Sequence, residues 1–459
     1  MLKLQKYIRK IYFRNKTRII NDYRILKANQ SLSLSELNHR QLVRLNNLLD
    51  HTYHHVPYYR ELFSKNGLVI NGRIQLQSLA ELAQIPFLTK DIIRDTGENL
   101  RADDHVTRKS FINSSGGSTG QPVVMRQDEA YTIADTANLL LLKDWRGVDP
   151  FDSEIFIWGA ERDTFGGKKP LSMRIADFLR NRIILSSFRM TDSDKREFIE
   201  LLNHHRPAMI RTYADSIYEL ARFIREHNLR IAPQHLIHTA ASNLHDFMRR
   251  DIEQVFQCPV FNHYGGREVG AIASECPAHD GLHIMMEHNL LEVVGPDGQP
   301  CRSGDEGEIV VTNLNNYSTP LIRYRIGDLG IMKEYEPCPC GCNYPRLQKV
   351  IGRVTDVFKN SKGHTIFPEY FIRLIRLLNH NGGIRKFQFI QNDRNRITVK
   401  IKSSGAISRL TLDEITGKIR LAMGDDCQVD FDFVDQIEAT ASGKYRFTIS
   451  EYDESETLR

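Results

Sequence analysis

The stretch FINSSGGSTGQPVV, residues 111–124, places small hydroxyl side chains and glycines between two apolar, strand-like ends. Glycine lets the main chain approach a ligand closely, because it has no Cβ to clash. Such a loop can present backbone N–H groups and hydroxyls to a phosphate chain. The candidate phosphate-binding residues are Ser114, Ser115, Gly116, Gly117, Ser118, Thr119 and Gly120. Plain loops have a similar composition, and the missing G-K-[ST] ending disfavours a P-loop NTPase.

The overall composition is that of a globular protein with a sizeable core. With 459 residues, 41% of them apolar and 26% charged, the chain is long enough for two to three domains. No run of 18 apolar residues occurs and no signal-peptide pattern opens the chain, so we expect a cytoplasmic protein. Seven cysteines, mostly in the second half, favour reduced thiols or a metal site over a disulfide framework.

The amino-terminal segment is strongly basic. Residues 1–24 carry eight Lys and Arg side chains against one aspartate, and Leu4, Ile8 and Ile11 recur at helical spacing. Such a helix is suited to peripheral contact with an anionic membrane surface. Contact with nucleic acid is a second interpretation. A third is a basic helix that packs its apolar face on the main domain.

Beyond this segment, short apolar strands alternate with helices. Helices are predicted from residue 34 to a break near Pro57, and at 128–145, 196–205, 215–226 and 244–256, with strands at 155–158, 209–213 and 236–239. A more compact pattern follows, with strands at 357–359, 386–391, 397–401 and 428–434 and helices at 368–378 and 412–423. We therefore predict an α/β protein with much parallel sheet. Its parts are a basic segment (1–30), a large layered α/β domain (31–355) and a small α+β domain (356–459).

Two further motifs carry residues suited to a nucleotide. In Tyr264-Gly-Gly-Arg-Glu268 the aromatic ring can stack on a flat base and the carboxylate can hold Mg²⁺. Asp328 follows the strand-like TPLIRYRIG and can accept hydrogen bonds from a ribose diol. A tight turn with a surface glutamate and a solvated turn aspartate are the plainer interpretations.

Five motifs occur in the order and spacing of adenylate-forming ligases. They are 114–122, 264–268, Thr319-Pro-Leu-Ile-Arg-Tyr-Arg325 with Gly327-Asp328, Gly352-Arg353 with Asp356, and Gly443-Lys444. Over roughly residues 40–450 the sequence resembles the phenylacetate-CoA ligase branch, which includes the CapK-like capsular polysaccharide biosynthesis proteins. The order of five motifs makes chance resemblance improbable.

The resemblance implies a role for each motif. The loop 114–120 would bind the β and γ phosphates of ATP, and Tyr264 with Gly265 would hold the adenine. Glu268 would ligate Mg²⁺, while Asp328 would bind the ribose.

The remaining motifs would serve the reaction itself. Arg353 would contact the ribose and phosphates, and Lys444 would bridge the substrate carboxylate and the α-phosphate. Asp356 would be the hinge of a mobile carboxy-terminal lid. Glu268, Arg353 and Lys444 are thus the expected catalytic residues.

A cysteine cluster forms a second candidate site. Cys338-Pro-Cys340-Gly-Cys342 lies downstream of ECPAHDGLH, residues 275–283. Thiolates and an imidazole suit structural Zn²⁺, and members of the branch carry zinc there. The expected ligands are Cys276, His283, Cys338 and Cys340, with His279 and Cys342 as competitors. Unligated thiols are the alternative, and Cys258, Cys301 and Cys427 are isolated.

The resemblance implies an ATP-dependent ligase that converts a small carboxylic acid to an acyl-adenylate and transfers the acyl group to coenzyme A. Alternatives are an amine or sugar acceptor in polysaccharide biosynthesis, a nucleotidyl transferase that stops at the adenylate, a degenerate ligase, and a zinc-containing nucleic-acid binder. For the ligase we expect no specific nucleic-acid partner. Arg162, Arg211, His238 and Arg267 lie on segments that would line the acyl pocket of a polar or dianionic acid, or else are ordinary charges at the core edge.

Overall fold

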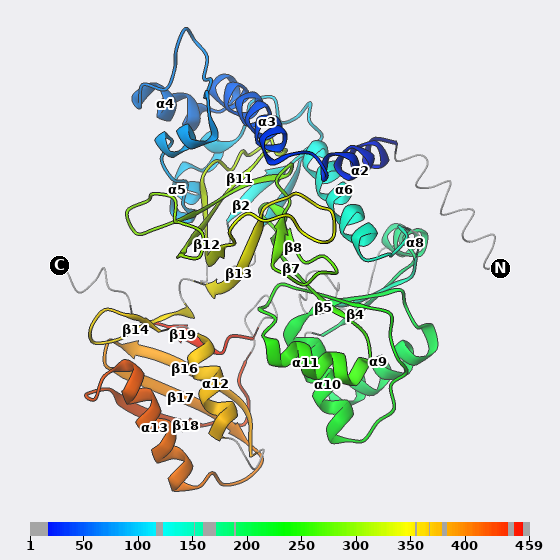
Figure 1. Cartoon of the computed structure of the whole chain (residues 1–459), viewed down its shortest axis with the longest axis vertical. Coiled ribbons are helices and arrows are strands. Elements are labelled where there is room, and N and C mark those ends of the chain that lie inside the picture. The colour runs from blue at the N-terminus through cyan, green and yellow to red at the C-terminus, as the bar shows by residue number, and fades with distance from the viewer. Residues whose placement is uncertain are drawn as a thin grey trace. The chain divides into compact units, whose positions relative to one another are not determined.

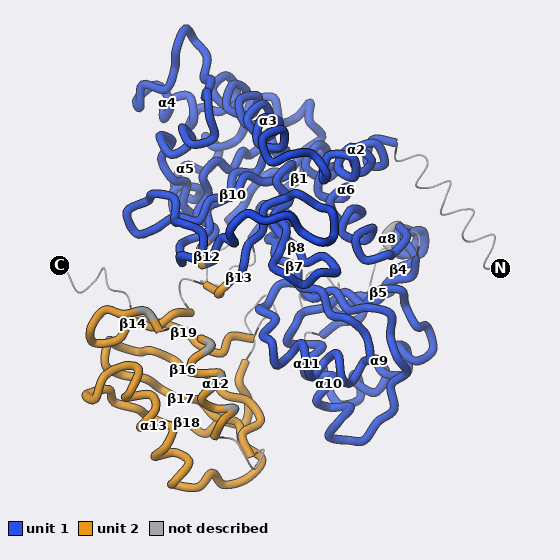
Figure 2. Tube along the Cα trace, in the orientation of Figure 1, with its two compact units in different colours: residues 1–326, 330–350, 441–443 blue, residues 327–329, 351–440, 444–459 orange. Residues whose placement is uncertain are grey.

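The structure is a computed structural model that describes residues 17–115, 123–150, 152–158, 171–187, 190–353, 356–366, 368–378, 383–438 and 445–452. It consists of two units (Figure 2). The first comprises residues 1–326, 330–350 and 441–443, and the second comprises 327–329, 351–440 and 444–459. The longest continuous stretch of the second unit begins at residue 351.

Parallel strands form one half of an 11-stranded sheet among the described residues. They are β3 (Glu154–Trp158), β4 (Arg182–Ser186), β5 (Met209–Tyr213), β6 (Ile237–Ala240) and β7 (Val260–Gly266), in the order β4-β3-β5-β6-β7. Helices connect them, as the alternating pattern predicts, and the α/β class is confirmed (Figure 1).

Antiparallel strands form most of the other half. They are β8 (Gly270–Ser274), β9 (Leu282–Ile284), β10 (Asn289–Val294), β11 (Glu306–Asn313), β12 (Tyr324–Met332) and β13 (Arg346–Arg353). They extend the sheet from β7 in the order β8-β9-β13-β12-β11-β10. Most of β11 is buried on both faces, and such strands lack the polar and apolar alternation that marks a solvent-facing sheet.

Among the described residues, five helices accompany the parallel half, and two of them begin at side-chain caps. They are α6 (Glu129–Trp145), α8 (Leu171–Leu179), α9 (Asp192–His205), α10 (Ala214–Glu226) and α11 (Asp246–Phe256). Thr191 and Asp194 form a capping box, so α9 starts four residues before the predicted position. Asp128 caps α6 through a hydrogen bond from the backbone N–H of Tyr131.

The preceding helices build the rest of the core. They are α2 (Thr17–Asn29), α3 (Leu34–His55), α4 (Pro57–Lys65), η1 (Leu79–Gln84), α5 (Lys90–Thr96) and η2 (Gly97–Leu100). A capping box of Ser33 and Glu36 starts α3, which ends just before Pro57 as predicted. Leu45, Leu48 and Leu49 of α3 are fully buried in the main core.

Helix α2 packs against α6. Arg18 pairs with Glu129 at 2.9 Å, Lys27 pairs with Asp144 at 2.8 Å, and Leu26 is buried. This part of the basic segment therefore corresponds to a helix packed on the main domain. Residues 1–16 lie outside the described part of the chain.

The second unit has its own sheet and core. Its strands β16 (Ile384–Asp393), β17 (Arg396–Ser403), β18 (Gln428–Phe433) and β19 (Thr448–Ser450) pair in the order β18-β17-β16-β19. A two-stranded sheet, β14 (Phe358–Lys359) and β15 (Thr365–Ile366), and helices α12 (Pro368–Leu378) and α13 (Arg409–Met423) complete it. Phe371, Phe389 and Ile415 are among the buried residues of this separate core. The small α+β fold is thus as predicted.

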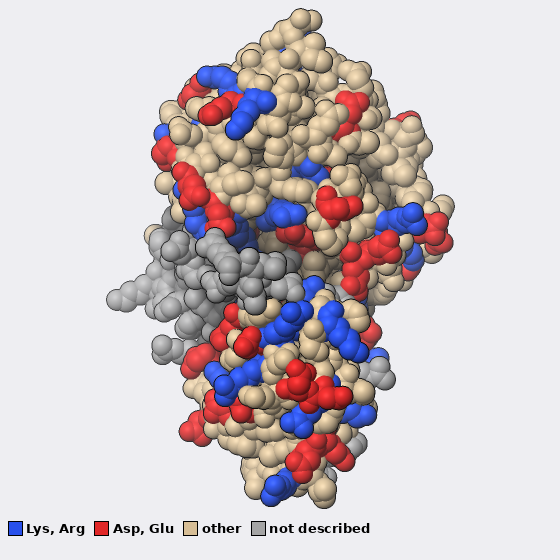
Figure 3. Space-filling view, turned by 90° about the vertical axis from the view of Figure 1, so that its left-hand side faces the viewer, with Lys and Arg blue, Asp and Glu red and all other residues tan. Residues whose placement is uncertain are grey.

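No helix of the described residues is long and apolar enough to cross a membrane. On the face shown in Figure 3, basic and acidic side chains are interspersed rather than gathered in a stripe of one sign.

Candidate functional site

A short hairpin carries the hydroxyl and glycine loop. Strands β1 (Phe111–Ser114) and β2 (Val124–Gln127) pair antiparallel, with Ser114 opposite Val124. Ser115 N–H donates to the Val123 carbonyl and Val123 N–H donates to Ser115 Oγ, each over 2.8 Å. These bonds close the base of the loop. Its tip, with Gly116, Gly117, Ser118, Thr119 and Gly120, lies outside the described residues.

Gln127 joins this hairpin to the aromatic and acidic turn. Its side-chain amide donates to the Arg267 carbonyl over 2.6 Å and to the Glu268 carbonyl over 3.3 Å. Its Oε1 accepts from Asn113 Nδ2 over 2.8 Å, which fixes the orientation of the amide. Two motifs 140 residues apart in sequence are thereby held side by side.

The same hairpin holds the segment that contains TPLIRYR. Asp128 Oδ2 accepts from the Tyr317 N–H over 3.0 Å, and Thr319 Oγ1 accepts from the Arg126 N–H over 3.1 Å. Arg323 is buried and pairs with Glu292 at 2.9 Å. The third motif is therefore anchored to the first through side-chain and backbone hydrogen bonds.

The turn between β7 and β8 leaves no room for a side chain at Gly265. A Cβ built there would lie 2.6 Å from the Gly270 carbonyl oxygen and 3.2 Å from His263 Nε2. Tyr264 is half-buried and packs against the main core. Glu268 is also half-buried, with its Oε2 3.1 Å from the position of a Cβ on Gly266.

The second unit contains an ion pair between two of the predicted nucleotide-binding residues. Asp328 is buried, and its Oδ1 lies 3.0 Å from Arg353 Nε. The two residues to which the resemblance assigns the ribose thus form an ion pair with each other.

Asp356 is bound to a residue that follows the predicted catalytic lysine. Its Oδ1 accepts from Arg446 Nε over 2.7 Å. Burial raises the pKa of Asp356, while Arg446 opposes that shift. Lys444 itself lies outside the described residues.

The four predicted zinc ligands lie together in the first unit. One ligand atom from each of Cys276, His283, Cys338 and Cys340 lies within 4.8 Å of the others. Cys276 Sγ is 3.6 Å from Cys338 Sγ, and Cys340 Sγ is 3.4 Å from His283 Nε2. A tetrahedron with Zn–S of about 2.3 Å and Zn–N of about 2.0 Å has edges of roughly 3.5–3.8 Å. The residues therefore fit a zinc ion.

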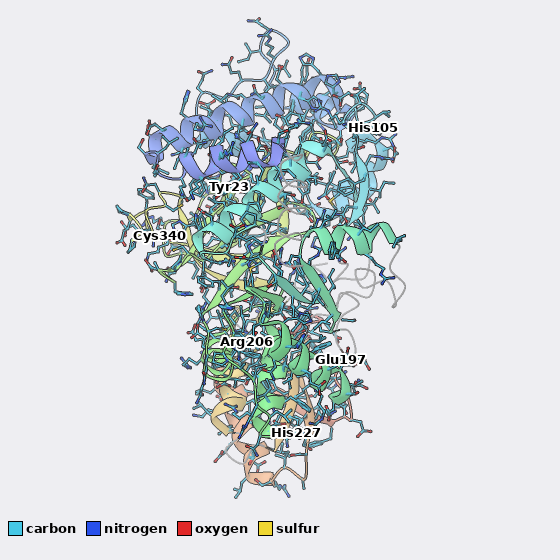
Figure 4. The ribbon with its side chains drawn as sticks, turned by 90° about the vertical axis from the view of Figure 1, so that its right-hand side faces the viewer. Tyr23, His105, Glu197, Arg206, His227 and Cys340 are labelled. Carbon is cyan, nitrogen blue, oxygen red and sulfur yellow. The ribbon has the colours of Figure 1, made fainter. Side chains whose placement is uncertain are left out.

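Neighbouring groups set the tautomer of His283 and shift the pKa values of the thiols. His283 Nδ1 lies 2.8 Å from the Tyr344 carbonyl, to which it can donate only as N–H, and this leaves Nε2 as the electron-pair donor toward the thiols. A hydrogen bond from Cys276 lowers the pKa of the Cys340 thiol, whereas that bond and burial raise the pKa of Cys276 to about 11. Cys340 is the exposed member (Figure 4).

The two competing candidates, His279 and Cys342, are not members of this group of four. His279 Nδ1 lies 3.3 Å from Glu275 Oε2, and its ring stacks on Phe261. Cys342 is buried, and its backbone N–H donates to Cys340 Sγ over 3.4 Å. An amide that donates to a sulfur is a typical outer partner of a thiolate ligand.

Sequence reasoning missed a second group of possible metal ligands, His51, His55 and Asp104. The two histidines are one helical turn apart on α3, which was the only available sequence signal. Asp104 accepts from Arg108 Nε over 2.8 Å and lies 3.1 Å from His51 Nε2. This group is already connected as an ion-pair network.

The comparisons with known proteins follow the same division of the chain. Residues 358–451 match the family model described as the CapK C-terminal domain. Protein CapK of Staphylococcus aureus is 26% identical over 407 residues, covering 86% of this chain and 84% of that protein. Phenylacetate-coenzyme A ligase of Thermus thermophilus is 27% identical over 359 residues, covering 74% of this chain and 75% of the ligase.

The fold is shared with a solved ligase. The crystal structure of 2-hydroxyisobutyryl-CoA ligase in complex with R3-HIB-AMP matches with a TM-score of 0.71 and 18% identity, covering 94% of this chain and 93% of that one. Fold and relatives together define a member of the adenylate-forming superfamily. Within it, the relatives and the carboxy-terminal family model support the CapK-like and phenylacetate-CoA ligase branch that the motifs predicted.

Proposed function

We propose that the protein is an ATP-dependent ligase that activates a carboxylic acid as an acyl-adenylate and transfers the acyl group to coenzyme A. The observation that carries this proposal is the pair of hydrogen bonds from Gln127 to the Arg267 and Glu268 carbonyls. They hold the phosphate-loop hairpin beside the aromatic and acidic turn. One nucleoside triphosphate would use the hairpin loop for its phosphates and the turn for its base and Mg²⁺.

The chemistry explains why such groups must converge. A carboxylate is a poor acyl donor, because its leaving group would be oxide. Attack of its oxygen on the α-phosphorus of ATP breaks the bond to pyrophosphate and forms an acyl-adenylate, whose leaving group is AMP. Two anions must meet in this step, so positive charge and N–H donors have to stabilise the phosphoryl oxygens.

Each motif residue has a role in that step. The N–H groups and hydroxyls of loop 114–120 would hold the β and γ phosphates, and Tyr264 would stack on adenine. Mg²⁺, held by Glu268, would supply charge that offsets the phosphate oxygens. Asp328 would accept the ribose hydroxyls, with Arg353 positioned by its ion pair to Asp328.

The second unit would exchange residues at the site between half-reactions. Lys444 would bring its ammonium group to the carboxylate and the α-phosphate during adenylation. Asp356, bound to Arg446, would act as the hinge. The bond between these two residues connects the hinge directly to the segment that carries the lysine.

Coenzyme A is the acceptor that the ligase relatives favour. The thiol sulfur would attack the acyl carbon of the adenylate, AMP would leave, and the thiol proton would pass to solvent. The similarity to a CapK protein supports a second candidate for the acceptor. In this alternative, an amine or a sugar hydroxyl of a polysaccharide precursor accepts the acyl group.

The cysteine cluster would hold structural zinc. Four ligands leave no open coordination position for a substrate, and three of them are buried. The ion would join Cys276 in the loop after β8 and His283 on β9 to the loop between β12 and β13, which carries Cys338 and Cys340.

We place the protein in the cytoplasm, and peripheral membrane contact would fall to residues 1–16, since α2 is packed on α6.

A pyrophosphate-release screen tests the proposal. The full chain is given ATP, Mg²⁺ and a panel of carboxylic acids that includes phenylacetate, amino acids and uronic acids, with and without coenzyme A. At least one acid should release pyrophosphate, and coenzyme A should convert its adenylate to a thioester. Release of pyrophosphate by none of the acids would contradict the ligase assignment, whereas an adenylate that reacts only with amines or sugars would select the second candidate.

A further inference from the structure

A set of cationic side chains lies between the end of α6 and the parallel strands. The set consists of Lys143, Arg146, Arg182 and Arg211. Lys143 pairs with Glu154, and Arg182 pairs with Asp177 at 2.6 Å. Arg146 donates to Ser274 Oγ over 2.5 Å and to the Glu275 carbonyl over 3.2 Å. Three of the four cations therefore have acceptors of their own.

Arg211 differs from the other three. Among the residues that the structure describes, its guanidinium has no hydrogen-bond acceptor and no ion-pair partner, and its Nε is buried. The group lies over the rings of Phe156 and Trp158, at 5.5 Å and 5.9 Å from their centroids. Burial lowers the pKa of Arg211 to about 10, yet the residue keeps part of its surface accessible. Burying a charged guanidinium without a hydrogen-bond acceptor costs free energy, and a bound anion would offset that cost.

Two histidines with unused ring nitrogens stand beside Arg211. His238 is its register partner on β6, so both side chains lie on the same face of the sheet. His238 and His263 are buried, and their ring centroids are 4.9 Å apart. Within the described ranges, His238 Nε2 and His263 Nδ1 have no hydrogen-bond partner. Burial lowers the pKa of both imidazoles, and the nearby arginines lower it further.

The tautomer of His238 follows from its one hydrogen bond. Arg146 can only donate, so His238 Nδ1 is the acceptor of their bond. The proton of the neutral ring is therefore on Nε2. Among the described residues, this buried N–H has no acceptor, and the same holds for the neighbouring guanidinium of Arg211.

The cationic group lies next to the proposed adenylate site. His263 Nε2 is 3.2 Å from the position that a Cβ on Gly265 would take, and His263 directly precedes Tyr264. Arg211 is two residues from the end of β5, and ligands of parallel α/β sheets bind beyond the carboxyl ends of the strands.

One carboxylate acts on Arg211 from the facing helix. Asp135 on α6 raises the pKa of Arg211, against the larger effect of burial. Its Oδ1, however, accepts from the Ala271 N–H over 2.9 Å and lies 3.9 Å from His288 Nε2. Asp135 is thus held by β8. The charge of Arg211 has no direct partner in the part of the chain that the structure describes.

We propose that Arg211 and His238 bind a second carboxylate on the acid that the enzyme activates. The substrate class is then a dicarboxylic acid, with one carboxylate at the adenylation centre and the other on the guanidinium and the His238 Nε2–H. A planar guanidinium matches a carboxylate with two parallel hydrogen bonds. This inference rests on the proposed function, because it identifies the far end of the same acyl pocket.

Binding of non-reactive acyl-adenylate analogues tests it. Calorimetry on the full chain compares acyl-sulfamoyl-adenosines in matched pairs, such as 5-carboxypentanoyl with hexanoyl and 4-carboxyphenylacetyl with 4-methylphenylacetyl. In at least one pair the carboxylate member should bind about 10-fold to 100-fold more tightly, as expected for charge-assisted hydrogen bonds. Arg211→Met should bring that ratio close to one, and Arg211→Lys should restore part of it.

Arg182→Met is the matched control, because its guanidinium lies over the same Phe156 ring but already has Asp177. It should leave the ratio as in the unmodified protein. Analogues that bind without any preference for a carboxylate, or a preference that survives Arg211→Met, would overturn the inference while leaving the ligase function intact. Failure of every analogue to bind would instead count against the ligase function itself.

Discussion

The side-chain amide of Gln127 and the backbone carbonyl of Arg267 are joined by a hydrogen bond of 2.6 Å. The first residue ends the strand that follows the phosphate loop, and the second lies inside the aromatic and acidic turn. The bond therefore fixes where the triphosphate end of a nucleotide would lie relative to its base and metal. A hydrogen bond from Asn113 to Gln127 Oε1 orients the Gln127 amide for this contact.

Gln127→Met should weaken ATP binding without unfolding the protein. The change keeps the side-chain length but removes two donated hydrogen bonds, each worth about 1 kcal/mol. We expect KM for ATP in pyrophosphate exchange to rise about 5-fold to 30-fold. Gln75→Met, at an exposed glutamine, is the control and should leave KM as it is. An equal KM in both variants would show that the bond does not position the site.

Parts of this site were predictable from sequence and parts were not. The motifs around Tyr264 and Asp328, and the grouping of Cys276, His283, Cys338 and Cys340, could be proposed because residue types in short spacings mark them. The bond from Gln127 was not predictable, because it joins residues 140 positions apart and any polar strand end could have made it.

The contact between Arg211 and His238 was also not predictable from local sequence patterns. Arg211 and His238 were named only as residues on suitable segments. Their adjacency depends on the register of β5 and β6, which no local pattern specifies. Two other residues were predicted to line the acyl pocket. Of these, Arg162 lies outside the described residues, and Arg267 accepts a hydrogen bond from Gln127 through its backbone carbonyl.

Asp328→Asn should raise KM for ATP about 10-fold or more while kcat falls less, if Asp328 binds the ribose. The amide loses the charge that holds Arg353 at 3.0 Å and is a weaker acceptor for two hydroxyls. The control is Asp430→Asn, which removes an exposed ion pair with Arg396 in the same unit and should change KM little. A KM that stays at the wild-type value in Asp328→Asn would contradict the ribose role.

Purified protein should contain about one zinc ion per chain by elemental analysis. Cys338→Ser should lose most of the metal and lower Tm by about 5 °C or more, because metal binding contributes to folding. Cys342→Ser serves as the comparison, since Cys342 donates only its backbone N–H to the cluster, and it should keep the metal. Zinc well below one equivalent in the unmodified protein would remove the proposal.

Stability at acid pH should depend on Asp104. Burial works to raise its pKa, but hydrogen bonds from Arg108 and His51 outweigh it and lower the pKa from 3.8 to about 2. A depressed carboxyl pKa contributes stability above the unfolded value and loses it as pH falls through the folded value. About 2 kcal/mol should therefore disappear between roughly pH 5 and pH 2.

Urea unfolding across that range measures the loss. Asp104→Asn should lower the free energy of unfolding at pH 7 and flatten its decline toward pH 2. The neighbouring Asp103→Asn, at a carboxylate that is 65% exposed, should follow the unmodified protein. An Asp104→Asn curve parallel to the unmodified one would show that the network of Arg108 and His51 does not stabilise the fold.

Lys444→Ala should separate the two half-reactions. The lysine is assigned to the carboxylate and the α-phosphate, where charge must be stabilised only during adenylation, so pyrophosphate exchange should fall by about 100-fold or more. Transfer to coenzyme A from a supplied acyl-adenylate should change much less, because the bond between the carboxylate oxygen and the α-phosphorus is already formed and AMP leaves without help from the ammonium group. Lys362→Ala, at an exposed lysine of the same unit, controls for the loss of a surface charge and should retain both activities. Equal loss of both half-reactions in Lys444→Ala would assign the lysine to binding or folding rather than to the adenylation step.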